Sequence, residues 1–196
     1  MRLGENQNAV FQNLSTSNHT VGVREKDDFY ATDPKAIDAL LESGIELNHR
    51  LLEPACGMGH LAKRLAEHGY DVTAFDIIDR GYGEVMDFFK YNDIWEGDII
   101  TNPPFKMSEP FIDHALGILN EGSKALFFLK LQFLEGSQRG FLFDSGQLAN
   151  VYVFRKRVGC AINGDFVRYK GSPVCYAWYE FIKGHEGSPV VHWINR

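Results

Sequence analysis

The sequence predicts one α/β domain built on a mostly parallel, doubly wound sheet. Short apolar runs typical of buried strands alternate along the chain with segments whose apolar residues recur at helical spacing. At 196 residues the chain is long enough for one well-cored domain and short for two. It contains no internal repeat or low-complexity tract. Strands that alternate with helices form βαβ units, in which a crossover helix joins parallel strands.

The predicted elements follow this alternation from residue 33 onward. A helix is expected over 33–44, with Pro34 near its first turn and Gly44 as its stop. A short apolar strand then leads into the glycine turn of EPACGMG, and a helix over 60–69 comes next. The rest of the chain predicts, in order, a strand over 71–79, a third apolar stretch ending at Asp87, a strand over 98–101, a helix over 108–122, and strands over 124–131, 150–155 and 173–182.

Residues 1–27 differ in composition from the rest of the chain. They are polar, rich in Asn, Ser and Thr, and without periodicity, so we expect a flexible arm there. Residues 28–196 are expected to form the single domain.

Composition narrows the class of protein. The cysteines Cys56, Cys160 and Cys175 are far apart and odd in number, which favours a reducing cytoplasm over a disulfide framework or a zinc site. The seven histidines show no metal-ligand spacing. No apolar run approaches the roughly 20 residues of a membrane span, and the N-terminal segment lacks the apolar core of a signal peptide. The sequence therefore predicts a cytoplasmic protein with neither a metal nor a membrane partner.

The glycine turn after the first strand indicates a ligand site. Gly57 and Gly59 stand between a strand and a helix, where glycine lets the backbone approach a ligand closely. With Ala62 the run matches G-x-G-x-x-A, and Asp76 follows at the end of the second strand. Taken alone, this pattern fits a nicotinamide dinucleotide site, in which the acid binds ribose hydroxyls, or a tight structural turn.

Glu53 favours a different ligand, because it ends the strand directly before the turn. An anion there would repel a pyrophosphate and suits a cationic ligand. S-adenosylmethionine (SAM) carries a sulfonium and an ammonium, together with a ribose for Asp76. At the end of the third stretch, Asp87 is placed to accept a hydrogen bond from the adenine amino group and Phe88 to pack on the ring. The alternative for Asp87 is a local cap.

The segment DIITNPPF ends the fourth strand with a stiff corner. Two prolines stop the ladder and fix their own φ angles, so they hold the Asn102 amide and the Pro103 carbonyl as two rigid acceptors. A primary or aromatic amine such as adenine N6 has two hydrogens to offer them. Phe105 would supply a stacking face.

These segments together resemble SAM-dependent methyltransferases that methylate amines, and most closely the phage-type DNA N6-adenine methyltransferases. EPACGMG resembles the first SAM-binding motif of the family, Asp76 its acidic second motif and Asp87–Phe88 its third. NPPF resembles the catalytic motif. DFYATDP resembles the segment that packs over the methionine part of SAM, and LKLQFLEGSQR and YVFRKRV resemble small prophage-borne members. The resemblance covers about residues 28–183.

The resemblance implies a Rossmann-like methyltransferase fold with seven strands, of which the last, within 173–182, is antiparallel. It implies direct methyl transfer to an exocyclic amine, with neither a metal nor a covalent enzyme intermediate. The catalytic residues would be Asn102, Pro103, Pro104 and Phe105. The cofactor-binding residues would be Tyr30, Ala31, Thr32, Glu53, Ala55, Gly57, Gly59, Asp76, Ile77, Asp87, Phe88 and Asn102.

DNA is the expected substrate, although the net charge of −6 is unusual for a tight duplex binder. A basic stretch over 155–170, with Phe166 and Tyr169 interleaved, is either a phosphate track or a solvated loop. After the last predicted strand only a short tail remains, so we expect no separate target-recognition domain. The candidate nucleic-acid contacts are Lys106, Arg139, Arg155, Arg157, Arg168 and Lys170.

Three alternatives remain open at this stage. The same catalytic motif serves enzymes that methylate amines in RNA or glutamine amides in proteins. A nicotinamide-dependent oxidoreductase would use the glycine turn but leaves Glu53 and NPPF unexplained. A non-catalytic SAM-binding module would leave NPPF without a role.

Overall fold

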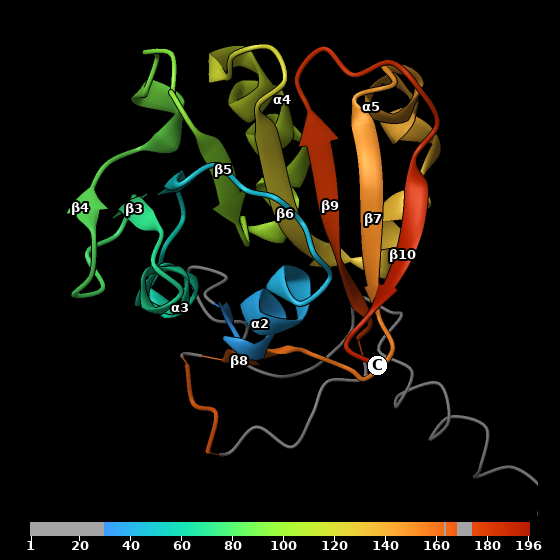
Figure 1. Ribbon diagram of the computed structural model, residues 1–196. Coiled ribbons are helices and arrows are strands. Elements are labelled where there is room, and N and C mark those ends of the chain that lie inside the picture. The colour runs from blue at the N-terminus through green and yellow to red at the C-terminus, as the bar shows by residue number, and fades with distance from the viewer. Residues whose placement is uncertain (1–29, 163, 168–173) are drawn as a thin grey trace, which may run out of the picture.

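The computed structural model describes residues 30–162, 164–167 and 174–196 and contains one large sheet with helices on both faces (Figure 1). The predicted arm over 1–27 lies outside the described residues. In sheet order the strands are β10 (Val190–Ile194), β7 (Leu148–Phe154), β9 (Tyr176–Ile182), β6 (Lys124–Lys130), β5 (Asp98–Thr101), β2 (Arg50–Glu53), β3 (Asp71–Asp76) and β4 (Glu84–Val85).

The predicted fold class is confirmed. Every neighbouring pair in the large sheet is parallel except for β9, which runs antiparallel to both β6 and β7. The seven expected strands correspond to β2, β3, β4, β5, β6, β7 and β9. Since β5, β2, β3 and β4 are parallel neighbours, their carboxyl ends meet at one edge of the sheet.

Two pairings go beyond the prediction. The segment after β9, expected to be a short tail, instead forms β10 parallel to β7 and buries Ile194. A separate two-stranded sheet joins β1 (Tyr30–Thr32) to β8 (Cys160–Ile162) in antiparallel register, with Ala31 opposite Ala161. The Asp33 N–H extends this pairing by donating to the Gly159 carbonyl at 3.0 Å.

The helices cover the sheet in two layers. In Figure 1, α2 (Lys35–Leu41) and α3 (His60–Glu67) lie in front of the sheet, and α4 (Ser108–Ile118) and α5 (Gly140–Asp144) lie behind it. The two hydrophobic clusters agree with this arrangement, because one contains side chains of α2 and α3 and the other those of α4 and α5. The three predicted helices are present but shorter. Within the part of the chain that the structure describes, four 3₁₀ turns complete the fold: η1 (Phe88–Lys90), η2 (Phe105–Met107), η3 (Leu131–Leu134) and η4 (Ser137–Arg139).

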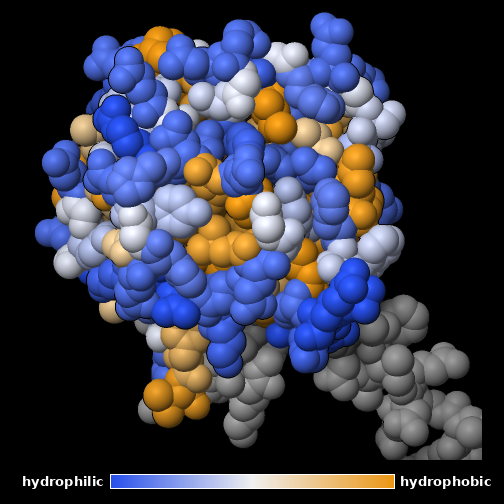
Figure 2. Space-filling model, viewed as in Figure 1, coloured by the Kyte–Doolittle hydropathy of each residue, from blue (hydrophilic) through white to orange (hydrophobic). Residues whose placement is uncertain are grey.

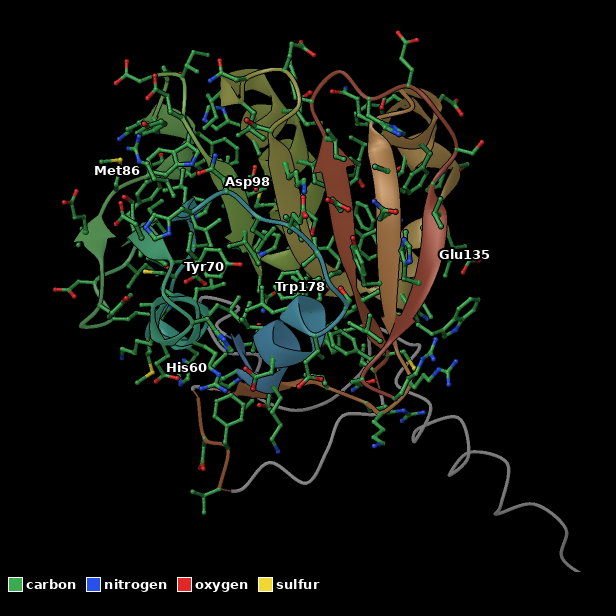
Figure 3. All side chains as sticks on the ribbon, in the orientation of Figure 1. His60, Tyr70, Met86, Asp98, Glu135 and Trp178 are labelled. Carbon is green, nitrogen blue, oxygen red and sulfur yellow. The ribbon has the colours of Figure 1, made fainter. Side chains whose placement is uncertain are left out.

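Trp178 on β9 ties the front layer to the sheet (Figure 3). Its side chain is fully buried, and its indole N–H donates to the Ala36 carbonyl of α2 at 3.0 Å. A buried indole N–H without an acceptor would cost about 1–3 kcal/mol, so this bond fixes where α2 sits.

The face seen in Figure 2 is largely hydrophilic, with hydrophobic side chains gathered near its centre. Among the described residues, none of the helices combines the length and apolar character needed to cross a bilayer.

Candidate functional site

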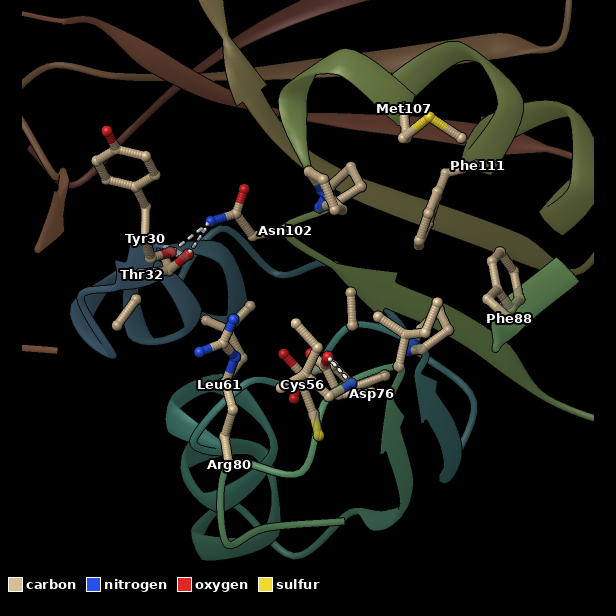
Figure 4. A pocket seen from close by; sticks show the side chains of 18 of the residues that line it. Tyr30, Thr32, Cys56, Leu61, Asp76, Arg80, Phe88, Asn102, Met107 and Phe111 are labelled. Atoms are coloured by element: carbon tan, nitrogen blue, oxygen red, sulfur yellow. Dashed lines mark hydrogen bonds between the residues drawn. The ribbon is translucent and has the colours of Figure 1, made fainter. Parts of the chain in front are cut away.

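A cavity of about 310 Å³ opens at the carboxyl edge of β2, β3 and β5, where β1 also contributes (Figure 4). A cavity of this volume suits a small-molecule ligand. The predicted cofactor-binding and catalytic residues line it, except for Gly57 and Gly59. Its lining comprises Tyr30, Ala31, Thr32, Glu53, Pro54, Ala55, Cys56, His60, Leu61, Asp76, Ile77, Ile78, Arg80, Asp87, Phe88, Phe89, Asn102, Pro103, Pro104, Phe105, Met107 and Phe111.

The two glycines shape the turn that carries the chain from β2 into α3. Both have positive φ angles, 55° at Gly57 and 76° at Gly59, a region that other residues rarely adopt. The ring of Tyr82 lies where a side chain at Gly59 would have to go. The Gly57 N–H donates to Asp76 Oδ2 at 2.9 Å, so the acid at the end of β3 holds the turn.

Glu53 is a buried carboxylate with an unused oxygen. The side chain is 2% exposed, and its Oε2 has no hydrogen-bond partner. Burial raises the pKa of Glu53 well above its usual range, while a backbone hydrogen bond from Ala62 lowers it and the nearby Asp76 raises it. An ionised carboxylate is stable in such a place only when a cation accompanies it.

The two acids that follow Glu53 along the sheet are already partly engaged. Asp76 Oδ1 accepts from the Ile78 N–H at 3.0 Å in addition to the bond from Gly57. Asp87 Oδ1 accepts from the Phe89 N–H at 3.1 Å and caps η1. The local cap expected as the alternative for Asp87 is therefore present, on a residue that also lines the cavity.

Phe88 forms an aromatic wall behind Asp87. It is 2% exposed, and its ring centroid lies 5.0 Å from that of Phe111 and 4.7 Å from that of His114, edge-on to the latter. These contacts fix the ring in one orientation against the cavity. Ile77 lies after β3 and is 64% exposed, although it lines the same cavity.

Asn102 is held by its nitrogen and leaves its oxygen unpaired. Its Nδ2 donates to the Tyr30 carbonyl at 3.1 Å and to Thr32 Oγ1 at 2.9 Å, and it lies 3.7 Å from Cys160 Sγ. Because a carbonyl can only accept, the nitrogen must face β1. Asn102 Oδ1 is buried without a partner and points away from β1 in Figure 4. The small β1–β8 sheet thus sets the orientation of this amide.

Phe105 follows the proline pair and belongs to a row of rings. Its centroid lies 6.2 Å from that of Tyr30 and 6.1 Å from that of Tyr176, which stacks at 4.9 Å on Phe128. Lys130 Nζ lies over the Phe105 ring, 4.7 Å from its centroid. The predicted aromatic face is therefore present beside the asparagine amide.

Two buried thiols lie in or near the site. Burial raises the pKa of Cys56 to about 12, with Glu53 adding to the effect, and burial also raises the pKa of Cys160 to about 12. Both remain thiols at neutral pH and are poor nucleophiles.

Lys106 and Arg139, predicted to contact nucleic acid, have different surroundings. Lys106 lies exposed in η2, directly after NPPF. Arg139 is engaged within the protein, where its Nε donates to Glu109 Oε1 at 2.8 Å and its Nη1 donates to the Glu135 carbonyl at 2.6 Å.

The other predicted contacts lie apart from the cavity or outside the described chain. Arg155 and Arg157 follow β7, and the Arg155 N–H donates to the Ile194 carbonyl of β10 at 3.2 Å. Arg168 and Lys170 lie outside the described residues.

Several lining residues were not predicted from the sequence. His60 begins α3 directly after Gly59, and burial lowers its pKa. Arg80, Met107 and Phe111 come from segments just beyond Asp76 and NPPF. For His60 the available sign was its position directly after the glycine turn, since the first turn of a helix that follows a ligand-binding loop faces the ligand.

No protein-family profile matches the chain, and no curated protein sequence does. Solved structures are similar at the level of the fold. A candidate modification subunit of a type I restriction enzyme from Vibrio vulnificus aligns with a TM-score of 0.57 and 13% identity, over 89% of this chain and 48% of that one. A candidate class I SAM-dependent methyltransferase from Listeria monocytogenes aligns with a TM-score of 0.53 and 13% identity, over 94% of this chain and 70% of that one. For a candidate RNA methyltransferase from Pyrococcus horikoshii, the TM-score is 0.51 and the identity 16%, over 73% of this chain and 78% of that one.

Identities this low concern the fold alone. These structures agree with the mixed, mostly parallel α/β sheet described above. The chain therefore has the α/β fold of class I SAM-dependent methyltransferases.

Proposed function

We propose that this protein transfers a methyl group from SAM to an exocyclic amine, namely N6 of adenine in DNA. The observation that carries the proposal is the buried, unpartnered Asn102 Oδ1, held at the carboxyl end of β5 beside the cavity. A buried acceptor left without a partner costs about 1–3 kcal/mol, which a substrate amine would recover.

The residues around the cavity fit SAM. Glu53 would bind the cationic methionine end, since its buried Oε2 lacks a partner. Asp76 would accept from the ribose hydroxyls and Asp87 from the adenine amino group, with Phe88 and Ile77 against the ring. Tyr30, Ala31 and Thr32 would cover the methionine part, with Ala55 and the Gly57–Gly59 turn beneath it. When bound, SAM supplies an electrophilic methyl group.

The catalytic corner would orient the accepting nitrogen. Asn102 Oδ1 and the Pro103 carbonyl would accept the two amine hydrogens, which draws the nitrogen lone pair out of conjugation with the ring. The prolines keep both acceptors rigid, and Phe105 stacks on the base. The nitrogen would gain the methyl group as the bond from that carbon to the sulfonium sulfur breaks, S-adenosylhomocysteine would leave, and the nitrogen would lose one proton to solvent. Neither Cys56 nor Cys160 offers a thiolate, consistent with transfer without a covalent enzyme intermediate.

The alternatives differ in substrate or in cofactor. RNA amines or a protein glutamine amide would use the same acceptors. A nicotinamide dinucleotide would bring its pyrophosphate beside Glu53, whose buried carboxylate opposes an anion. A target adenine in duplex DNA would have to leave the base stack first.

The test is to incubate the protein with SAM and unmethylated DNA of mixed sequence and to quantify the methylated nucleosides by mass spectrometry. N6-methyladenine should form. Asn102→Ala should lower its rate roughly 10²–10³-fold, the effect of losing one pre-organised group in the transition state, while SAM binding changes little. Asn92→Ala, at an exposed asparagine, is the matched control and should behave as the wild type.

N4-methylcytosine would keep the mechanism and change the base. If SAM binds but no base is methylated in double- or single-stranded DNA, the DNA assignment is wrong.

A further inference from the structure

Charge is divided across the site. Three carboxylates line the cavity on one side of β5: Glu53 ends β2, Asp76 ends β3, and Asp87 follows β4. On the other side of β5, the last residue of β6 is Lys130. The catalytic corner on β5 stands between them, so a ligand that spans it meets acids at one end and a base at the other.

The surroundings of Lys130 do not neutralise its charge. Its Nζ lies over the ring of Phe105, 4.7 Å from the centroid, and the side chain is half-buried. Among the described residues, no carboxylate oxygen lies within the 4.0 Å of an ion pair. The nearby Cys160 remains a neutral thiol. An ammonium group over an aromatic face is only partly compensated, so an anion would complete its environment.

A neutral substrate could not supply the anion that would complete the environment of Lys130. A glutamine amide in a polypeptide has no negative group at a fixed distance from its nitrogen. A nucleotide does, because a phosphate is attached to the same sugar as the base. Phosphate contacts fix the register of a nucleic acid without reading its sequence.

We infer that Lys130 binds a backbone phosphate next to the target base and that the substrate of this site is therefore a polynucleotide. The inference rests on the proposed amine-methylating function. In it, Phe105 stacks on the base while the ammonium group at its ring holds the strand. Lys130 was not among the nucleic-acid contacts predicted from the sequence.

Binding of fluorescent 20-nucleotide oligomers, as duplex DNA, single-stranded DNA and RNA, would be measured between 50 and 200 mM salt with S-adenosylhomocysteine present. The slope of log K against log salt should fall by about 0.9 on duplex DNA, or about 0.7 on single strands, in Lys130→Met. The methionine keeps an unbranched apolar chain over Phe105 and removes only the charge. Affinity at 50 mM salt should drop about tenfold.

Two further variants separate this role from a general charge effect. Lys130→Arg should keep the wild-type slope. Lys183→Ala removes a positive charge just after β9, at the end of the sheet opposite Lys130, and should also keep the wild-type slope. Far-UV circular dichroism and affinity for S-adenosylhomocysteine check that Lys130→Met remains folded.

The outcomes distinguish this inference from the proposed function. If the wild type methylates DNA but Lys130→Met keeps its slope and affinity, the inference is wrong and the function stands. If the slope falls but RNA is the only polynucleotide methylated, Lys130 keeps its role and the DNA assignment is wrong. Methylation of a glutamine peptide with no methylation of any polynucleotide overturns both.

Discussion

The Glu53→Gln variant should be more stable than the wild type, by a difference in unfolding free energy that grows as the pH rises. The buried carboxyl group has a raised pKa in the folded state, so the folded protein holds its proton more tightly than the unfolded chain. The wild type therefore loses stability as the pH rises from the unfolded pKa of about 4.3 to the folded pKa, and the loss is constant above that. Glutamine has no proton to lose and can still accept the hydrogen bond from Ala62.

The size of the effect follows from the linkage. Each pH unit between the two pKa values widens the stability gap by about 1.4 kcal/mol, which gives at most about 2.7 kcal/mol between pH 5 and pH 7. For a domain of this size, that difference corresponds to roughly 5–10 °C in melting temperature. The pH at which the gap stops widening is the pKa of Glu53 in the folded state.

Urea unfolding of both proteins at half-unit steps from pH 5 to pH 8 measures the gap. Glu84→Gln removes a carboxylate from the exposed strand β4 and serves as the control. Saturating SAM should narrow the gap at pH 7 by about 1.4–2.7 kcal/mol, because the ligand's ammonium group would pair with the ionised Glu53 and should bind Glu53→Gln about tenfold to a hundredfold more weakly. A gap between wild type and Glu53→Gln that does not change with pH would refute the assignment of Glu53 as a buried carboxylate awaiting a cation.

Three other substitutions test the frame of the site. Thr32→Val removes an acceptor of the Asn102 amide at nearly constant volume. It should lower the initial rate of methylation about tenfold and the free energy of unfolding, measured in urea, by about 1 kcal/mol. Unchanged rates would argue against the role of β1 in orienting this amide. Gly59→Ala should lose about 1–3 kcal/mol more stability than Gly44→Ala. Both glycines have positive φ angles, but only Gly59 lies against a tyrosine ring. Equal losses of stability in parallel thermal melts of the two variants would contradict this. Trp178→Phe should destabilise the fold by about 1–3 kcal/mol through the orphaned carbonyl and lost volume, with SAM affinity per folded molecule unchanged in calorimetry.

The sequence was sufficient to predict where the motifs converge. Glu53, Asp76, Asp87 and Asn102 each follow an apolar run, and parallel strands place such residues at one edge of a sheet. That reasoning needs only strand order and polarity, and the cavity lined by all four agrees with it.

The orientation of the Asn102 amide could not be predicted in the same way. It depends on the pairing of β1 with β8, two short segments far apart in the chain with no local pattern that joins them. β10 was missed for another reason. Its run VVHWI has strand character, but it follows the last strand that the family resemblance implies, and so it was assigned to a tail. Lys130 has no sequence sign at all, since a lysine at the end of a strand is ordinary.

The pairing of β1 with β8 also has a consequence for biosynthesis. The strands β2, β3 and β4 are close in sequence, so the part of the cavity proposed to hold SAM can assemble early as the chain emerges. Tyr30 and Thr32, by contrast, must wait for Cys160 and its neighbours before their strand has a partner. The nitrogen of Asn102 therefore gains a fixed place only late in synthesis. A nascent chain stalled before residue 160 would lack the strand that pairs with β1 and so fixes the two acceptors of this nitrogen.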